Sequence, residues 1–168
     1  MDITQFAKMF PQKMAEVRKY VEGEGVKIDM GRTALNHFDE NFEKGGFVDS
    51  VLNPWKEVER RKPDSPWFGH SGQTGKRSPE RMNAPILHGV TRELRRTTRM
   101  EILSNGVHII NSTPYAAVHQ FGGKAKIYGK KPFTMPKRPF IGRSKALTQK
   151  IQTKILQRLK ELCLLYTS

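Results

Sequence analysis

The stretch of sequence that most constrains this fold is YAAVHQFGG at residues 115–123. It predicts a short helix, because hydroxyl residues and Pro114 stand before it and Gly122 stands just past its end. Tyr115 and His119 then lie one turn apart on the same face of that helix. A lone histidine beside a tyrosine has no carboxylate or nucleophile partner and makes no catalytic set.

A second stretch, MPKRPFIG at residues 135–142, follows after a short interval, and we call it the strap. Met135 and Arg138 each precede a proline, which favours an extended backbone. Phe140 and Ile141 are the residues expected to anchor the strap to the core. Between the two stretches, residues 123–135 predict a basic loop.

Residues 1–50 predict two helices. Asp2 can cap the first, Pro11 should kink or split it, and Gly23 ends it together with Gly25. The second helix is expected over residues 29–44, before Gly45-Gly46. The apolar residues at helical spacing are Ile3, Phe6, Met9, Phe10, Met14, Val17 and Val21 in the first helix, and Ala34, Leu35, Phe38 and Phe42 in the second.

Residues 53–88 contain repeated prolines and glycines and show no periodicity, which predicts a long irregular loop. Its aromatic residues, Trp55, Trp67 and Phe68, indicate that parts of it pack against other segments.

Alternating side chains then predict a β-hairpin that turns at Asn105-Gly106 and returns over residues 107–111. In the first strand, Leu94, Thr98, Met100 and Ile102 alternate with Arg95, Thr97, Arg99 and Glu101. A final helix is expected over residues 144–162, where leucines and isoleucines recur at helical spacing from Leu147 to Leu162.

The expected fold is therefore α+β, a small antiparallel sheet packed against N-terminal and C-terminal helices, with a long irregular loop. We expect one domain over 1–168. Its helical part is 1–50, its loop is 53–88, and its sheet, short helix and last helix occupy 89–162. The tail at 163–168, CLLYTS, resembles a read-end artefact of assembled metagenomes and is a candidate non-native segment.

Charge is distributed unevenly along the chain. The formal net charge is +14, yet residues 1–50 hold 7 basic and 9 acidic residues, whereas residues 121–160 hold 12 basic residues and no acid. Such a chain favours acidic partners: nucleic acid, an anionic membrane or an acidic protein surface. An acidic and a basic segment also permit head-to-tail contact between copies, and solubility with a few internal ion pairs is the simpler interpretation.

Several kinds of chemistry are disfavoured by the sequence. A single cysteine, Cys163, excludes an internal disulfide and a zinc site of several thiolates, and it suits a reducing cytoplasm. No apolar run approaches the length of a membrane span, and the N-terminus does not resemble a signal peptide, so no membrane partner is expected.

No enzymatic motif survives inspection. GHSGQTGK at residues 69–76 places five residues between Gly69 and Gly75, where a phosphate-binding loop requires four. The five histidines show no metal-binding spacing. The acid-free stretch 121–160 offers no carboxylates for a nuclease metal. We therefore expect no catalytic residues, no metal and no cofactor.

The same acid-free stretch could bind nucleic acid without reading its sequence, because lysines and arginines contact phosphates and aromatic residues lie among them. The candidate contacts are Lys124, Lys126, Lys130, Lys131, Lys137, Arg138, Arg143 and Lys145, with Tyr128 and Phe133 interleaved. A basic, non-sequence-specific DNA-binding protein of phage origin is therefore an alternative function.

With its aromatic, His, Gly-Gly and Arg-Pro-Phe residues in order, the pair YAAVHQFGG and MPKRPFIG resembles the signature of the phage virion morphogenesis proteins. These are the tail-completion or neck proteins of Mu-like and P2-like phages and prophages. Weaker likeness covers ALNHFDENFEKGGFVDS, NPWKEVERR and APILHGVTRELRRTTRMEI. The chain departs from the family where Arg92-Glu93 and Lys137 stand, since the family often has glycine after Thr91 and alanine in place of that lysine.

This resemblance implies a non-enzymatic subunit that forms rings at the head–tail junction, in the virion or in the host cytoplasm during assembly. The implied partners are further copies of the chain and tail tube, terminator or connector proteins. A ring uses two complementary surfaces, which the acidic N-terminal and basic C-terminal halves could supply. The expected interface residues are Tyr115, His119, Gln120, Phe121, Gly122, Gly123, Arg138, Pro139 and Phe140.

Overall fold

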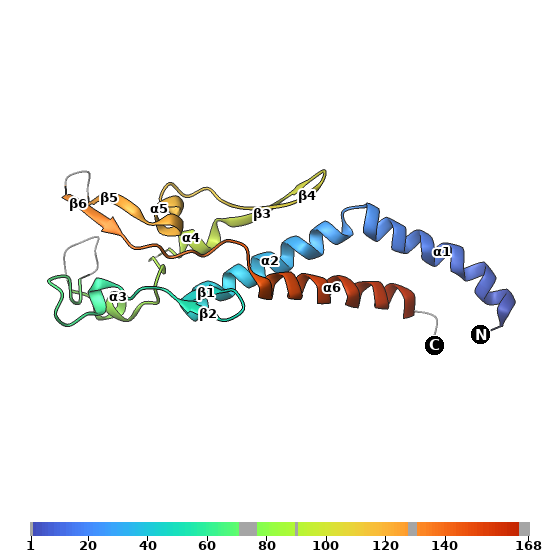
Figure 1. The fold of residues 1–168 in the computed structure, drawn as a ribbon, viewed down its shortest axis with the longest axis horizontal. Coiled ribbons are helices and arrows are strands. Elements are labelled where there is room, and N and C mark those ends of the chain that lie inside the picture. Colours follow the sequence, from blue (N-terminus) through green and yellow to red (C-terminus); the bar gives the residue numbers. More distant parts are fainter. Residues whose placement is uncertain (1, 71–76, 90, 128–130, 165–168) are drawn as a thin grey trace. The chain divides into compact units, whose positions relative to one another are not determined.

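A computed structural model describes residues 2–70, 77–89, 91–127 and 131–164 of the chain. Helices alternate with three two-stranded sheets in these residues, which confirms the predicted α+β class (Figure 1). The elements are α1 (Ile3–Glu22), α2 (Gly25–Lys44), β1 (Gly46–Val48), β2 (Leu52–Pro54), the 3-10 helix η1 (Glu59–Arg61), α3 (Pro79–Asn83), α4 (Glu93–Arg96), β3 (Thr98–Leu103), β4 (Gly106–Asn111), α5 (Ala116–Phe121), β5 (Gly123–Ile127), β6 (Lys131–Met135) and α6 (Lys145–Leu164).

The chain packs as two compact units, and each takes segments from distant parts of the sequence. Unit 1 comprises Met1–His37, Arg99–Ile110 and Ser144–Ser168, and unit 2 comprises Phe38–Thr98 and Asn111–Arg143. This division does not test the expectation of a single domain over 1–168, which stays a prediction.

In unit 1, α1 packs against α6, and the start of α2 packs against the β3–β4 hairpin. Tyr20 of α1 is buried and donates a hydrogen bond from its hydroxyl to Asp29 Oδ2 at 2.9 Å. On α2, Gly31 lies close to this hairpin, since a Cβ there would lie 2.5 Å from Met100 Sδ and 3.0 Å from Val107 Cγ1.

The two N-terminal helices differ from expectation in detail. The Asp2 cap is confirmed, because Thr4 N donates to Asp2 Oδ1 at 3.4 Å. Pro11 does not split α1, which runs through it as one helix. A proline removes one backbone donor there, and tertiary packing such as that of α1 on α6 stabilises helices more than local propensity does. Helix α2 begins at Gly25, four residues before the expected start, and His37 within it is fully buried.

Helix α6 agrees with its prediction to within two residues. Ser144 caps it, since Leu147 N donates to Ser144 Oγ at 3.0 Å. Leu147 is buried, and the later members of the apolar stripe, Ile151, Ile155, Leu159 and Leu162, are half-buried.

The predicted central hairpin is present as β3 and β4, and burial alternates along β3 as expected. Its first strand begins at Thr98 and not at Leu94, which corrects the prediction. Residues Glu93–Arg96 instead form the helical turn α4, where Thr97 Oγ1 donates to Glu93 O at 2.8 Å. Leu94 is thereby directed into the core of unit 2.

The core of unit 2 is a cluster of apolar side chains from six separate segments: Phe42, Trp55, Ile86, Leu94, Ala116 and Phe140. Phe42 lies at its centre, with ring centroids 5.8 Å from Trp55 and 5.5 Å from Phe140. Phe140 is 1% exposed, so the predicted anchoring of the strap is confirmed.

The segment predicted as a long irregular loop contains β2, η1 and α3 among its described residues. Strand β2 pairs with β1 in an antiparallel register that places Gly46 opposite Pro54. The expectation that parts of this segment pack against other segments is confirmed by Trp55, which is buried, whereas Trp67 is 47% exposed.

Residues 123–135, predicted as a basic loop, form the antiparallel hairpin β5–β6 in their described part. Lys124 pairs with Thr134 and Lys126 with Pro132. Both lysines are exposed, while Ala125 between them is half-buried. The polar–apolar–polar order of these three residues is therefore the alternation that a strand requires. Pro132 is tolerated because each strand of a two-stranded sheet is an edge strand.

Candidate functional site

The short helix α5 begins later than expected. It starts at Ala116 with Tyr115 as its N-cap, and no side chain caps it. The hydroxyl of Thr113 instead donates to Asn111 Oδ1 at 2.7 Å, so the predicted hydroxyl cap and first-turn proline are wrong. The predicted end is confirmed, because Gly122 follows the helix with a φ of 73°.

Gly122 brings α5 into direct contact with the strap. A Cβ at this position would lie 2.9 Å from Lys137 N and 3.0 Å from Met135 O, closer than a side chain tolerates. The approach allows Arg138 N to donate to His119 O at 2.8 Å. Glycine is thus needed here both for its positive φ and for its lack of a side chain.

Gln120 of α5 holds the strap through its side-chain amide. Its Oε1 accepts from Phe140 N at 3.0 Å and from Ile141 N at 3.2 Å. Its Nε2 donates to Ile141 O. One side chain therefore satisfies three backbone groups in a region that is largely shielded from water, where unpaired groups are costly.

Two further side chains hold the strap from other segments. Asn41 of α2 is fully buried, donates from Nδ2 to Phe140 O at 3.1 Å and accepts at Oδ1 from Val48 N at 2.9 Å. Trp55 Nε1 donates to Pro139 O at 2.7 Å. Sequence reasoning missed this role of both residues, although a polar Asn41 directly before Phe42 in a buried stripe is a signal for a specific partner.

Arg138 is the buried one of the two charged residues of the strap, since Lys137 is exposed. Arg138 is 5% exposed, and it donates from Nε to Lys56 O at 3.0 Å and from Nη2 to Glu57 O at 3.4 Å. Burial lowers the pKa of its guanidinium. A side chain proposed from sequence for phosphate contact is thus occupied with backbone carbonyls.

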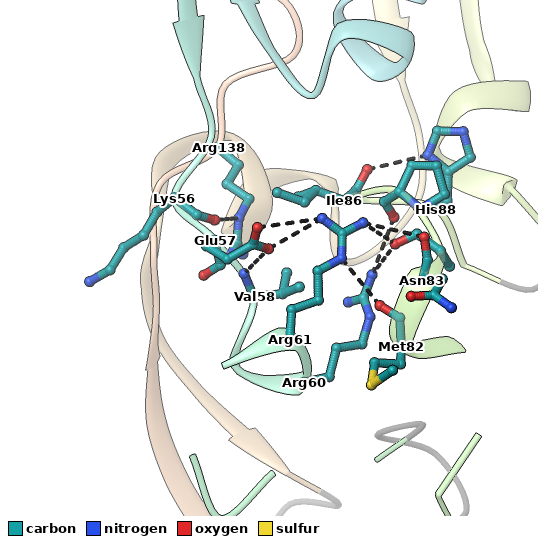
Figure 2. Close-up of polar contacts among 12 residues, drawn as sticks. Lys56, Glu57, Val58, Arg60, Arg61, Met82, Asn83, Ile86, His88 and Arg138 are labelled. Atoms are coloured by element: carbon teal, nitrogen blue, oxygen red, sulfur yellow. Dashed lines mark hydrogen bonds and ion pairs between the residues drawn. The ribbon is translucent and has the colours of Figure 1, made fainter. Parts of the chain in front are cut away.

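Two adjacent arginines, Arg60 and Arg61, make a similar set of bonds to the end of α3 (Figure 2). Arg60 donates from Nε to Arg81 O at 2.6 Å and from Nη2 to Ala84 O at 2.7 Å. Arg61 donates from Nε to Met82 O at 3.2 Å and shares Ala84 O, at 2.7 Å. These bonds satisfy the carbonyls that a helix leaves unpaired at its C-terminus. Nothing in the sequence pattern indicated them.

Tyr115 and His119 face one another as predicted, with ring centroids 5.9 Å apart at an interplanar angle of 85°. The Tyr115 hydroxyl donates to Glu93 Oε2 at 2.6 Å, and burial together with this bond raises the pKa of Tyr115 to about 12. Burial, with a smaller contribution from the nearby Arg138 charge, lowers the pKa of the His119 imidazole. His119 Nδ1 is buried and has no hydrogen-bond partner among the described residues.

These groups surround a cavity of about 510 Å³ in unit 2. Its charged and polar lining residues are Arg60, Arg81, His88, Thr91, Glu93, Tyr115, His119 and Arg138, and its apolar lining residues include Val58, Ile86, Leu87, Leu94 and Met135. Part of each signature stretch therefore faces the same cavity.

A comparison with protein-family models matches residues 56–160 to the phage virion morphogenesis family. The chain belongs to this family. The matched residues include α5, the strap and the arginines at the end of α3, so the family extends over most of unit 2 and part of unit 1. No curated protein and no solved structure matches the chain.

In this member of the phage virion morphogenesis family, the predicted interface residues divide by exposure. Arg138 and Phe140 are buried, and His119, Gln120, Gly122 and Pro139 are half-buried. Tyr115, Phe121 and Gly123 are exposed, with Phe121 reaching 72%. The interface itself stays a prediction, and its accessible part is the exposed group.

Most of the predicted nucleic-acid contacts lie on the surface of the protein. Lys124, Lys126, Lys137, Arg143 and Lys145 are exposed, whereas Lys130 lies outside the described residues. Lys131 opens β6. Within the described ranges, no group of three or more His, Cys, Asp or Glu side chains could hold a metal ion. No helix there is long and apolar enough to cross a membrane.

Proposed function

We propose that this protein is a structural subunit that completes the tail or joins it to the head of a phage particle, acting through a ring of identical copies and without catalysis. Its membership of the phage virion morphogenesis family supports the particle role. Further copies of the chain, together with tail tube, terminator or connector proteins, are its partners, and it acts in the particle or at its assembly in the host cytoplasm.

The observation that carries the assembly part of the proposal is the open apolar face of α1. Five of its apolar side chains are exposed: Ile3, Phe6, Phe10, Met14 and Val21. They recur at helical spacing along most of the helix, and the rings of Phe6 and Phe10 lie 5.4 Å apart. Contiguous apolar surface of this kind typically marks a contact with another macromolecule.

A second copy of the chain is the occupant that the charges favour. Between Ile3 and Glu22, α1 carries Lys8, Lys13, Arg18 and Lys19 against Glu16 and Glu22, and Asp2 precedes it. The helix region is thus nearly neutral in a chain of net charge +14. Two strongly positive copies repel one another least where such a neutral surface is placed between them.

A ring requires each subunit to use two different surfaces. We assign the second surface to the exposed members of the predicted interface, Tyr115, Phe121 and Gly123. The exposed aromatic ring of Phe121 offers the apolar anchor that protein interfaces commonly contain.

Mass photometry and negative-stain microscopy of the purified protein test the proposal. Phe10→Glu places a charge on the apolar face of α1 and should reduce the oligomer to monomers, whereas Gln12→Glu, on the polar face of the same helix, should leave it intact. In a complementation assay, only Gln12→Glu should restore joined particles. A wild-type protein that stays monomeric and never enters particles would overturn the proposal.

The alternative function, non-sequence-specific DNA binding, is supported by one observation in the structure. Lys124 and Lys126 are both exposed on the same strand, and residues 121–160 contain no acid to neutralise them. Such a surface binds duplex DNA through phosphate contacts alone.

A further inference from the structure

The cavity beside α5 has a strongly positive wall. Three guanidinium-bearing residues, Arg60, Arg81 and Arg138, line it, and Glu93 is the carboxylate among its lining residues. Glu93 already accepts the hydroxyl of Tyr115. The Glu93 carboxylate therefore already accepts a hydrogen bond from an uncharged hydroxyl.

The three arginines are bonded to neutral acceptors. Arg60 and Arg138 donate to backbone carbonyls, as described above, and Arg81 Nη2 donates to His88 O at 3.0 Å. Among the described residues, none of the three forms an ion pair. Backbone carbonyls orient guanidinium groups and satisfy some of their donors, but they do not neutralise the positive charge. Glu57 and Glu59 lie near enough to offset part of the charge of Arg138, and Glu57 part of that of Arg60, without lining the cavity.

The pKa of Arg60 reflects this grouping of positive charges. Burial, followed by the neighbouring charges of Arg81 and Arg61, lowers the pKa of Arg60 to about 10. Like charges held together in a partly buried site are unfavourable until a negative group enters.

Two further features of the cavity are a histidine ring nitrogen without a hydrogen-bond partner among the described residues and a residue with an uncommon backbone conformation. His119 Nδ1 is buried without a hydrogen-bond partner among the described residues, and its side chain lines the cavity. Leu87, another lining residue, has a φ of 61°, a left-handed conformation that a leucine rarely adopts. Backbone strain of this kind concentrates at sites that bind ligands.

We propose that this cavity is a receptor for the carboxylate of an acidic side chain presented by another protein chain. Guanidinium groups pair with carboxylates through two parallel hydrogen bonds. The apolar lining residues Val58, Leu87 and Met135 suit the methylene stem of that side chain. A phosphate on the convex backbone of a DNA duplex would not enter a recess of this kind, which favours a protein ligand.

The proposal rests on the cavity alone and does not depend on ring formation. It is tested in the full chain by NMR of protein with isotope-labelled histidines, with glutarate as a small carboxylate probe. Inorganic phosphate and sodium chloride at equal ionic strength serve as comparison ions. Glutarate should shift the His119 ring signals saturably and raise the pKa of His119, because a bound anion favours the imidazolium.

A matched pair of variants locates the site. Arg81→Gln removes one guanidinium charge from the cavity and should weaken glutarate binding about tenfold, the value of one charge-assisted hydrogen bond. Arg99→Gln removes an exposed arginine of β3 and should change the affinity less than about twofold.

Each outcome decides the proposal. If glutarate perturbs His119 no more than chloride does in the wild-type protein, there is no carboxylate site. Tighter binding of phosphate than of glutarate would overturn the assignment to a carboxylate. Because the wild-type titration needs no variant, misfolding of Arg81→Gln would not hide either result, and a monomeric protein that binds glutarate would contradict the ring proposal only.

Discussion

At the scale of single residues, the side-chain amide of Gln120 makes three hydrogen bonds to backbone groups of Phe140 and Ile141 in the strap. We expect Gln120→Ala to lower the free energy of unfolding of unit 2 by about 2–4 kcal/mol, because it leaves shielded backbone groups unpaired. Hydrogen exchange of the Phe140 and Ile141 amides should accelerate with it. Chemical denaturation and exchange mass spectrometry measure the two effects.

Gln149→Ala is the control for this prediction, because Gln149 is an exposed residue of α6. Its effect should stay within about 0.5 kcal/mol. Equal losses in the two variants would show that the amide of Gln120 contributes no more than a surface side chain.

Gly122 gives a second prediction at the same scale. Gly122→Ala introduces a Cβ at a φ of 73° and within 3.0 Å of two strap atoms, so it should destabilise the protein by at least about 2 kcal/mol. Gly106→Ala, where a Cβ meets nothing within 4 Å, should cost far less. Thermal unfolding of both variants distinguishes them, and equal melting temperatures would contradict the close approach.

His119 should make the protein sensitive to acid. Because its pKa is lowered in the folded state, the unfolded chain binds the proton more readily, and stability falls as the pH drops through about 6.5, the usual pKa of histidine. The charge of Arg138 acts on His119, the Tyr115 ring packs against it, and Arg60, Arg81, His88 and Glu93 are the other charged or titratable residues that line the same cavity.

His119→Gln should reduce this loss of stability between pH 7.5 and pH 5, as measured by denaturation at each pH. His108→Gln, at an exposed position of β4, should keep the wild-type dependence. If the dependence persists unchanged in His119→Gln, another group is responsible.

Residue-level reasoning from sequence succeeded where the cause is local. Gly122 ending a helix and Phe140 entering the core follow from glycine conformation and from hydrophobicity, and both are confirmed. The strap partners of Asn41 and Trp55 lie 99 and 84 positions away, and no local pattern encodes such pairs. The cavity was missed for the same reason, since its arginines come from separate segments.

At the scale of elements, long amphipathic helices were predicted well and short elements poorly. The apolar stripes of α1, α2 and α6 extend over many turns, which averages out local irregularity. Strands β5 and β6 were predicted as a basic loop because they are short, with five residues each, because β6 contains Pro132, and because basic residues are frequent in them. In α4, the alternation of Leu94 with Arg95 resembled a strand, whereas burial of Leu94 in unit 2 favours a helical turn.

Pro11 allows a test at this scale. It lies within α1 and lacks the backbone donor that a helix needs, so Pro11→Ala should stabilise α1 by about 1–3 kcal/mol. Hydrogen exchange of the α1 amides should slow accordingly. Unchanged exchange would indicate that the chain around Pro11 adapts to the proline without cost. Ala15→Gly, one turn later, should have the opposite effect, by about 1 kcal/mol.

At the scale of the whole molecule, the net charge of +14 leads to a prediction on salt. If the exposed lysines of β5 contact DNA, replacing Lys124 and Lys126 by glutamine should weaken duplex binding and lower the slope of log affinity against log salt by about 2. Fluorescence anisotropy at several salt concentrations measures both. The absence of binding by the wild type at low salt would remove the alternative function.

The division of the chain between the two units has a consequence for synthesis on the ribosome. Unit 2 has all of its residues once Arg143 has been translated, whereas α1, made first, waits for α6 at the other end of the chain. Until then the residues of α1 that pack on α6 are exposed together with its apolar face. Nascent chains on one polysome would present these faces to one another, so contacts between copies could begin before any copy has finished folding.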